Sequence, residues 1–281
     1  MPIVLSLAYS NDTLYAAGPE GLFQLENGEL VAMPQPQVEL ACCAAANGRI
    51  WVGGLPHGVA FTLSNGSWQA GWMDGVGDSI YCIAPDPRVE HTGVILAGSA
   101  GGGILRSHNR GQTWSVCNYG LQEFNVLSLA WAPQSPAGRW PRWEFVFAGT
   151  EHGAYRSPNA GRGWKQSEGI EGVVQSIAVA PDFHESGVVL AATESNGLWR
   201  STDAGRSYSK VAQVADQINA IVATADEWFL SDAQGVWRSK SGTEWQIIPG
   251  VPPALTMINT AQAVWAGGEE GVFEVFTRKA A

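Results

Sequence analysis

The chain has 281 residues, of which 45% are hydrophobic and 15% are charged, so its composition is that of a packed globular protein and excludes a disordered one. The formal net charge at pH 7 is −10, with 16 basic and 26 acidic residues and no basic run, which argues against nucleic acid and anionic membranes as partners. A cationic partner or a neutral small molecule is easier to accommodate.

The N-terminal run Met1–Ala8 has no basic segment before its short apolar stretch, so it is interpreted as a first strand rather than a signal peptide. No run approaches the length that spans a bilayer, and we expect a cytoplasmic chain without membrane insertion. The cysteines at 42, 43, 82 and 117 show no metal-ligand spacing and are expected to be free thiols.

Seven uncharged apolar runs recur along the chain and are predicted to open seven successive repeats. Three of them stop at an Ala-Pro pair, because proline has no N–H for a sheet ladder. Runs without charge are typical of strands buried on both faces, which we expect here. The runs are Val4–Tyr9, Leu40–Ala45, Ile80–Ala84, Val126–Ala132, Val174–Ala180, Ile218–Ala223 and Leu255–Thr260.

A second strand with a small-residue end follows each run, and a glycine then opens a third strand. The spacing of these glycines brackets the roughly 40–50 residues of one four-stranded propeller blade. The sequence therefore predicts an all-β fold, a seven-bladed β-propeller that forms a single domain over 1–281 with no separate linker or tail. A parallel β-helix is the alternative, but its coils are shorter than these repeats. The glycines are Gly21, Gly58, Gly103, Gly153, Gly197, Gly235 and Gly271.

Three near-complete copies of a Ser-x-Asn/Asp-x-Gly-x-x-Trp/Tyr turn follow the third strands, and a shortened fourth copy ends at Trp245. An Asn or Asp side chain caps such a turn by accepting backbone N–H bonds, and the glycine supplies a positive φ. The aromatic residue is expected to fill the gap between adjacent blades. The residues given this structural role are Ser107, Asn109, Gly111, Trp114, Ser157, Asn159, Gly161, Trp164, Ser201, Asp203, Gly205 and Tyr208.

These turns resemble the Asp-box, Ser-x-Asp-x-Gly-x-Thr-Trp, and the chain is similar to the Asp-box or BNR-repeat propeller superfamily. That superfamily includes sialidases, xyloglucan-degrading hydrolases, sortilin-type receptors and photosystem II assembly factors. The resemblance implies a propeller with the turns on one face and the loops between second and third strands on the other. It implies little about function, because one fold carries many functions.

Four arginines could suggest the carboxylate clamp of a sialidase, but all occupy one slot, just before the serine of the turn. A clamp needs arginines that converge from different positions, so we expect a structural role in which the aliphatic stem covers apolar surface. The Phe-Arg-Ile-Pro segment and the Tyr–Glu pair of sialidases cannot be located. The four are Arg106, Arg156, Arg200 and Arg238.

The loops between second and third strands are mostly acidic and are expected to share one face with the linkers between blades. The simplest interpretation is that these carboxylates are only solvated. The more specific interpretation is that the face recognises a cationic partner. Zinc-ligand spacing and the EF-hand pattern are absent, so neither a metal nor a cofactor is expected. The candidate partner-binding residues are Trp72, Asp74, Tyr119, Glu123, Glu151, His152, Glu194, Asp232 and Glu269.

The favoured function is a non-catalytic scaffold or recognition propeller that binds a protein or peptide through one loop face. The alternative is a glycan-binding or glycoside-hydrolase-like propeller that uses loop carboxylates and aromatics. Whether the chain is an enzyme stays open, with a non-catalytic role favoured. The last repeat is expected to form a three-stranded blade that closes on the first by side-chain packing. Its outer strand would be an edge that Arg278 and Lys279 protect or a second molecule pairs with, and the oligomeric state stays open.

Overall fold

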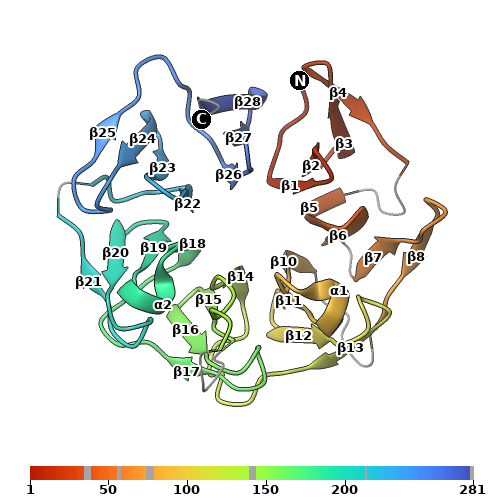
Figure 1. The fold of residues 1–281 in the computed structure, drawn as a ribbon, viewed down its shortest axis with the longest axis horizontal. Coiled ribbons are helices and arrows are strands. Elements are labelled where there is room, and N and C mark those ends of the chain that lie inside the picture. Colours follow the sequence, from red (N-terminus) through yellow and green to blue (C-terminus); the bar gives the residue numbers. More distant parts are fainter. Residues whose placement is uncertain (35–38, 56–57, 74–78, 139–143, 213, 279–281) are drawn as a thin grey trace. The chain divides into compact units, whose positions relative to one another are not determined.

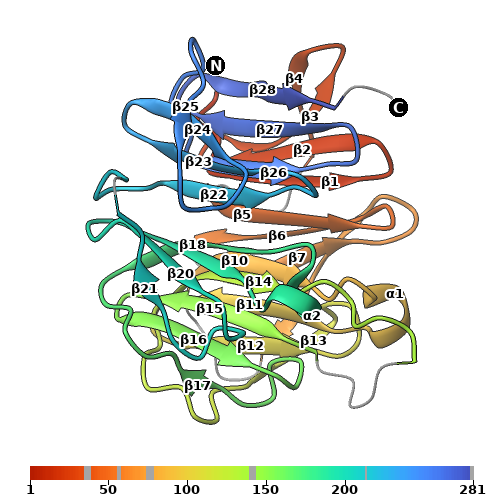
Figure 2. The same cartoon turned by 60° about the vertical axis from the view of Figure 1, so that its left-hand side comes forward.

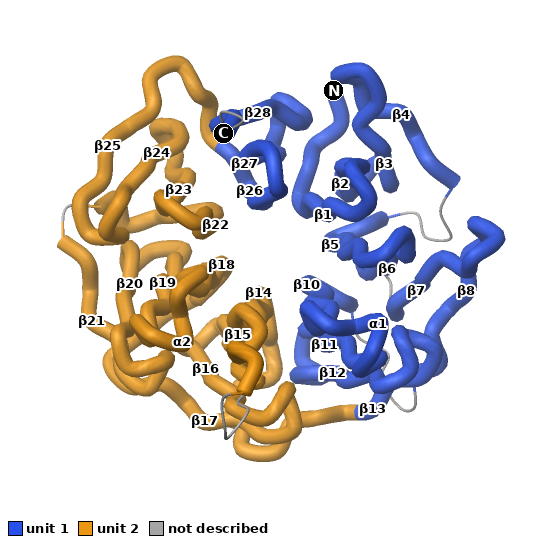
Figure 3. Tube along the Cα trace, in the orientation of Figure 1, with its two compact units in different colours: residues 1–115, 254–281 blue, residues 116–253 orange. Residues whose placement is uncertain are grey.

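The computed structural model describes residues 1–34, 39–55, 58–73, 79–138, 144–212 and 214–278. Seven sheets follow one another along the chain, one for each predicted repeat, and their strands are antiparallel except where β9 pairs parallel with β13 (Figure 1). By their contacts the residues divide into two compact units, which Figure 3 shows in different colours. The first unit comprises Met1–Ser115 and Ala254–Ala281, and the second comprises Val116–Pro253.

The first unit holds the first, second, third and seventh sheets. The first sheet is β1 (Ser6–Ser10), β2 (Thr13–Gly18), β3 (Gly21–Glu26) and β4 (Glu29–Ala32), and the second is β5 (Glu39–Ala46), β6 (Arg49–Leu55), β7 (Val59–Thr62) and β8 (Trp68–Ala70). The third is β10 (Ile80–Pro85), β11 (Ile95–Ser99), β12 (Ile104–Ser107) and β13 (Thr113–Val116), with β9 (Trp72–Met73) added alongside β13 and the short helix α1 (Val89–Thr92) after β10. The seventh is β26 (Thr256–Asn259), β27 (Ala263–Gly268) and β28 (Gly271–Thr277).

The second unit holds the fourth, fifth and sixth sheets. The fourth is β14 (Val126–Trp131), β15 (Val146–Thr150), β16 (Gly153–Ser157) and β17 (Lys165–Gln166). The fifth is β18 (Val174–Val179), β19 (Val189–Thr193), β20 (Leu198–Ser201) and β21 (Ser209–Lys210), with the short helix α2 (Phe183–Ser186) after β18. The sixth is β22 (Ala220–Ala223), β23 (Trp228–Asp232), β24 (Gly235–Ser239) and β25 (Gln246–Ile247).

In the third, fourth, fifth and sixth sheets the second strand, not the first, is the most buried, which corrects the sequence-based expectation. Every residue of β11, β15, β19 and β23 is buried, whereas β14 and β26 are largely half-buried. A second strand has a hydrogen-bonded neighbour on each side, while a first strand is an edge of its sheet. An uncharged run therefore indicates packing here but does not require burial on both faces.

The predicted turns after β12, β16 and β20 share one hydrogen-bond pattern. Ser107 Oγ donates to Asn109 Oδ1 at 3.0 Å and accepts from the backbone N–H of Gly111 at 2.9 Å. Asn109 Oδ1 also accepts from the N–H of Thr113 at 2.9 Å. The turn needs two successive residues with positive φ, 58° at Arg110 and 89° at Gly111, which explains the glycine.

The aromatic residue of the third-sheet turn packs against the preceding sheet. Trp114 lies in one apolar cluster with Trp51 and Phe61 of the second sheet. Trp51 Nε1 donates to the carbonyl of Arg110 at 3.0 Å, so the turn is also tied to its neighbour by a hydrogen bond. The same turn position in the fifth sheet, Ala204, accepts from Arg156 Nη1 of the fourth sheet at 3.4 Å.

The small residues that end the second strands admit the next sheet at close range. A Cβ placed on Gly149 would lie 2.8 Å from Val174 Cγ1, at the start of the fifth sheet. A Cβ on Gly53 would likewise lie 2.7 Å from Ile80 Cγ2 of the third sheet. Glycine at these positions therefore sets how closely consecutive sheets pack.

The seventh sheet has three strands among the described residues, as predicted, and Figure 2 shows β26, β27 and β28 side by side. It packs on the first sheet through Val4 and Leu7, which cluster with Trp265 and Val272. The N–H of Val4 also donates to the carbonyl of Gly268 at 3.0 Å, a backbone contact that the sequence did not predict.

Arg278 does not protect the outer edge of β28. Its guanidinium turns back to the β26–β27 connection, where it donates to the carbonyls of Thr260 and Ala261, both at 3.0 Å, and to Asn259 Oδ1 at 2.6 Å. An arginine gains more from fixed carbonyl acceptors than from solvent at an open edge. Lys279 lies outside the described residues.

Candidate functional site

Glu151 and His152 form the turn between β15 and β16, at one end of the fourth sheet. The turn is held by Thr150 Oγ1, which donates to the carbonyl of Gly153 at 2.8 Å and accepts from the N–H of His152 at 3.3 Å. The N–H of Glu151 donates to the carbonyl of Asn125 at 3.3 Å. This contact brings the segment that precedes β14 beside the turn.

Glu123, Glu151 and His152 meet at this end, and we call them the Glu–Glu–His cluster. Nδ1 of His152 lies 2.6 Å from Oε2 of Glu123. Asn125 Nδ2 donates to Oε2 of Glu151 at 3.0 Å, which fixes the second carboxylate. One potential ligand atom from each cluster residue lies within 4.8 Å of the others.

Glu123 is held as a carboxylate in this cluster. Burial raises its pKa, but hydrogen bonds from the N–H of Asn125, from His152 and from the N–H of Phe124 together lower it below the usual value. The two N–H groups donate to Oε1 at 3.1 and 2.8 Å. Its side chain is 20% exposed, whereas that of His152 is 76% exposed. The cluster thus presents a fixed negative charge next to an accessible imidazole.

Two carboxylates and one imidazole within reach of a single cation can act in two ways. They could bind a divalent metal ion, for which oxygen and imidazole donors are suitable ligands. They could equally bind the ammonium or guanidinium group of a partner through charge-assisted hydrogen bonds. All three residues belong to the longer predicted set, but the sequence does not indicate that they meet, because Glu123 lies in a linker and the other two in a turn.

Trp72 and Tyr119 do not lie at the strand ends that carry the acidic turns, which corrects the expectation that the linkers join those turns. The N–H of Trp72 donates to the carbonyl of Gln112 at 2.8 Å, beside the Ser-x-Asn turn of the third sheet. The carbonyl of Tyr119 accepts from the N–H of Trp164 at 2.8 Å, beside the matching turn of the fourth sheet. The linkers begin along the outer strands, so their first residues lie near these turns.

The remaining candidates divide by exposure. Glu194 and Glu269 are exposed in the turns after β19 and β27. Asp232 is only 1% exposed, and its Oδ1 accepts from the N–H groups of Gln234 and Gly235 at 2.8 and 3.2 Å. It caps the β23–β24 turn and is therefore not available to a partner, which corrects its place in the predicted surface. Asp74 lies outside the described residues.

Comparison with known proteins identifies the fold of this chain but assigns it to no family. Neither a protein-family model nor a curated protein matches the chain. A structure of YCF48 bound to D1 peptide matches 99% of this chain and 94% of that chain, with a TM-score of 0.73 at 14% identity. The fold is a seven-bladed β-propeller. Its sheets are referred to as blades from here on.

Two longer proteins contain a similar propeller. The GH74 xyloglucanase from Xanthomonas campestris matches with a TM-score of 0.75 at 14% identity, over 98% of this chain and 52% of that chain. The extracellular domain of a proposed one-component system from B. thetaiotaomicron matches with a TM-score of 0.74 at 11% identity, over 100% and 39%. The chain thus spans about half or less of these two proteins, and at such identities the likeness shows the fold alone.

The only helices among the described residues are α1 and α2, of four residues each. Neither approaches the length or the apolar character that crossing a bilayer requires.

Proposed function

We propose that this propeller is a non-catalytic recognition module that binds a protein or peptide partner through a basic group of that partner. The observation that carries the proposal is the Glu–Glu–His cluster, in which hydrogen bonds hold Glu123 ionised and Asn125 orients Glu151. Preorganised carboxylates bind a Lys or Arg side chain without having to be ordered first. The net charge of −10 adds attraction at long range.

The similar structures are consistent with this role without assigning it. YCF48 is a propeller of nearly the same length that was solved with a bound peptide. We also propose that the chain is of the Asp-box type. Support for this comes from Asp203, whose Oδ1 accepts from the N–H groups of Arg206 and Ser207 at 2.9 and 3.0 Å, as an Asp-box aspartate would.

A glycan-binding or glycoside-hydrolase-like role is the second candidate, and one specific observation favours it. Trp72, in β9, and Tyr119, in the turn that follows β13, are 72% and 85% exposed. Exposed aromatic rings offer apolar faces to a flat ligand such as a sugar ring. The paired carboxylates of Glu123 and Glu151 would then be the groups to test for acid–base chemistry.

The two candidates are separated by a binding screen on the full chain, with arrays of Lys- and Arg-containing peptides and of neutral oligosaccharides. We expect peptides to bind, with a dissociation constant that rises steeply between 50 and 500 mM NaCl because exposed charges are screened over about 8 Å at physiological ionic strength. The double variant Glu123→Gln/Glu151→Gln should weaken peptide binding by about tenfold or more.

The matched control is Glu194→Gln/Glu269→Gln, which changes the net charge equally at exposed glutamates of two other blades. If the control weakens binding as much as the cluster variant, only overall charge is at work and the cluster is not the site. Oligosaccharide binding without peptide binding would replace the proposal with the second candidate.

A further inference from the structure

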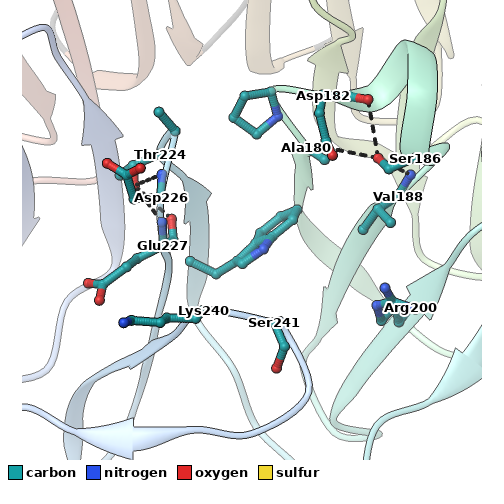
Figure 4. A pocket seen from close by; sticks show the side chains of 13 residues that line it. Ala180, Asp182, Ser186, Val188, Arg200, Thr224, Asp226, Glu227, Lys240 and Ser241 are labelled. Carbon is teal, nitrogen blue, oxygen red and sulfur yellow. Dashed lines mark hydrogen bonds between the residues drawn. The ribbon is translucent and has the colours of Figure 1, made fainter.

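A cavity of about 590 Å³ lies in the second unit, between the fifth and sixth blades (Figure 4). Its lining includes Arg200 and Val188 of the fifth blade and Glu227, Trp228 and Lys240 of the sixth. Cavities of roughly 300–1,000 Å³ are the usual size of small-molecule sites. The Glu–Glu–His cluster contributes no residue to it.

The cavity coincides with a deletion in the sixth-blade turn. The fifth-blade turn runs from Ser201 to Gly205, with Thr202, Asp203 and Ala204 between them, and the N–H of Gly205 donates to Ser201 Oγ at 2.9 Å. In the sixth blade the same contact joins Gly242 to Ser239 at 2.9 Å, but with one residue fewer between them. The missing position corresponds to that of Ala204, because Ala204 has a φ of 60° before its glycine, whereas Ser241 before Gly242 has no positive φ.

That position matters because its carbonyl accepts a hydrogen bond from the preceding blade. Ala204 accepts from Arg156 of the fourth blade, and Arg110 accepts from Trp51 of the second. Arg200 occupies in β20 the register that Arg156 occupies in β16, opposite a buried second-strand residue. Its expected carbonyl is absent from the shortened turn.

One buried atom in each of two charged lining residues is left without a hydrogen-bond partner. Within the part of the chain that the structure describes, the buried Nε of Arg200 and the buried Oε2 of Glu227 make no hydrogen bond. Figure 4 shows Arg200 on one wall and Glu227 with Lys240 on the opposite one. A buried polar group without a partner is costly, so each one needs an explanation such as a bound molecule.

The other lining groups narrow the chemistry of that molecule. The lining holds charges of both signs, with acidic groups at Asp182, Asp226 and Glu227 and basic groups at Arg200 and Lys240. A ligand that satisfies both unpartnered atoms presents an acceptor to Arg200 and a donor to Glu227. Charged partners satisfy a guanidinium and a carboxylate better than neutral hydroxyl groups do.

We propose that this cavity binds a small zwitterion of the α-amino acid class. Its carboxylate accepts from Arg200, its ammonium donates to Glu227, and its side chain packs on Trp228 and Val188. The site does not depend on the proposed peptide role, because its residues and those of the Glu–Glu–His cluster do not overlap.

The test is isothermal titration of the full chain with the common α-amino acids, supported by their effect on the melting temperature. We expect at least one to bind with a millimolar or tighter dissociation constant. Its N-acetyl and methyl ester derivatives should each bind about tenfold more weakly or worse, because each removes one of the two charges. Ligand analogues keep the test valid even where a variant fails to fold.

Variants then assign the contacts. Glu227→Gln and Arg200→Lys should each weaken binding by about tenfold, whereas Arg156→Lys, the same slot one blade earlier, should leave it unchanged. Insertion of one alanine between Ser241 and Gly242 should restore the five-residue turn and abolish binding. The proposal is overturned if no amino acid binds, if the N-acetyl derivative binds as well as the parent, or if a neutral monosaccharide binds instead.

Discussion

The aspartate of the fifth-blade turn illustrates how one side chain organises a turn. Asp203 accepts from the N–H groups of Arg206 and Ser207 through Oδ1, and from the hydroxyl of Ser207 through Oδ2 at 2.7 Å. Burial raises its pKa, but these hydrogen bonds outweigh burial and lower the pKa to about 2. Asn109 and Asn159 perform the same capping without a charge.

Asp203→Ala should lower the free energy of unfolding at pH 7 by about 1 kcal/mol, because the turn loses its capping acceptor and the site is partly exposed. A lowered pKa means that the charged form stabilises the fold at higher pH. The difference between wild type and variant should therefore be complete above about pH 4 and shrink as the pH falls towards 2. Urea unfolding at several pH values measures it.

Asp203→Asn is the matched control, since the chain already uses asparagine at this position in two other turns. This variant should keep most of the unfolding free energy of the wild type, and it should lose the decrease with falling pH that the Asp203 carboxyl causes. A variant with native stability but lost peptide binding would instead identify Asp203 as part of a site.

At the scale of strands, the contact between first and seventh blades depends on a glycine near the end of β27. A Cβ on Gly267 would lie 2.5 Å from Val4 Cγ1 and 3.1 Å from Thr256 Cγ2. Its backbone φ is not positive, so the glycine is required by close approach and not by backbone conformation. The same reasoning applies to Gly149 and Gly53 at other blade contacts.

Gly267→Ala should destabilise the protein by about 1–3 kcal/mol through overpacking. Val4→Ala removes the opposing methyl groups and by itself leaves a small cavity. The double variant should lose about 1 kcal/mol less unfolding free energy than the two single variants lose together, as expected for residues in contact. Chemical denaturation of the four proteins measures this coupling, and additive effects would show that Val4 does not pack on β27.

At the scale of the whole molecule, the question is whether blades open singly or together. Cys43 lies in the apolar cluster between the first and second blades and is 5% exposed. Burial raises the pKa of its thiol to about 12, despite a hydrogen bond with Ser6. At pH 8 only about one thiol in ten thousand would be ionised, so labelling requires opening of the structure.

We expect iodoacetamide labelling of Cys43 in dilute urea to follow the free energy of global unfolding measured by circular dichroism. The first and second blades share an apolar cluster, so they cannot separate from each other without exposing a core surface. Tandem mass spectrometry, with fragmentation between the two cysteines of one tryptic peptide, distinguishes Cys43 from its neighbour Cys42. Labelling at a much lower free energy would show that the first and second blades separate locally.

Much of the architecture could be predicted because its determinants are local. The glycine that opens each third strand, the apolar runs and the Ser107-to-Trp114 turn pattern all act within a few residues, where backbone conformation and periodicity decide the structure. That local information was sufficient to predict seven blades.

Contacts between residues that are distant in sequence are determined only by the tertiary structure. Asp232 and Glu194 occupy equivalent turns, yet one is buried as a cap and the other is exposed. Glu123 meets His152 because a linker and a turn 29 residues apart come together, and Arg200 Nε lies without a hydrogen-bond partner beside the shortened turn of the next blade. A repeat pattern determines which local shapes recur, whereas burial, charge pairing and cavities depend on which copies differ and on what packs against them.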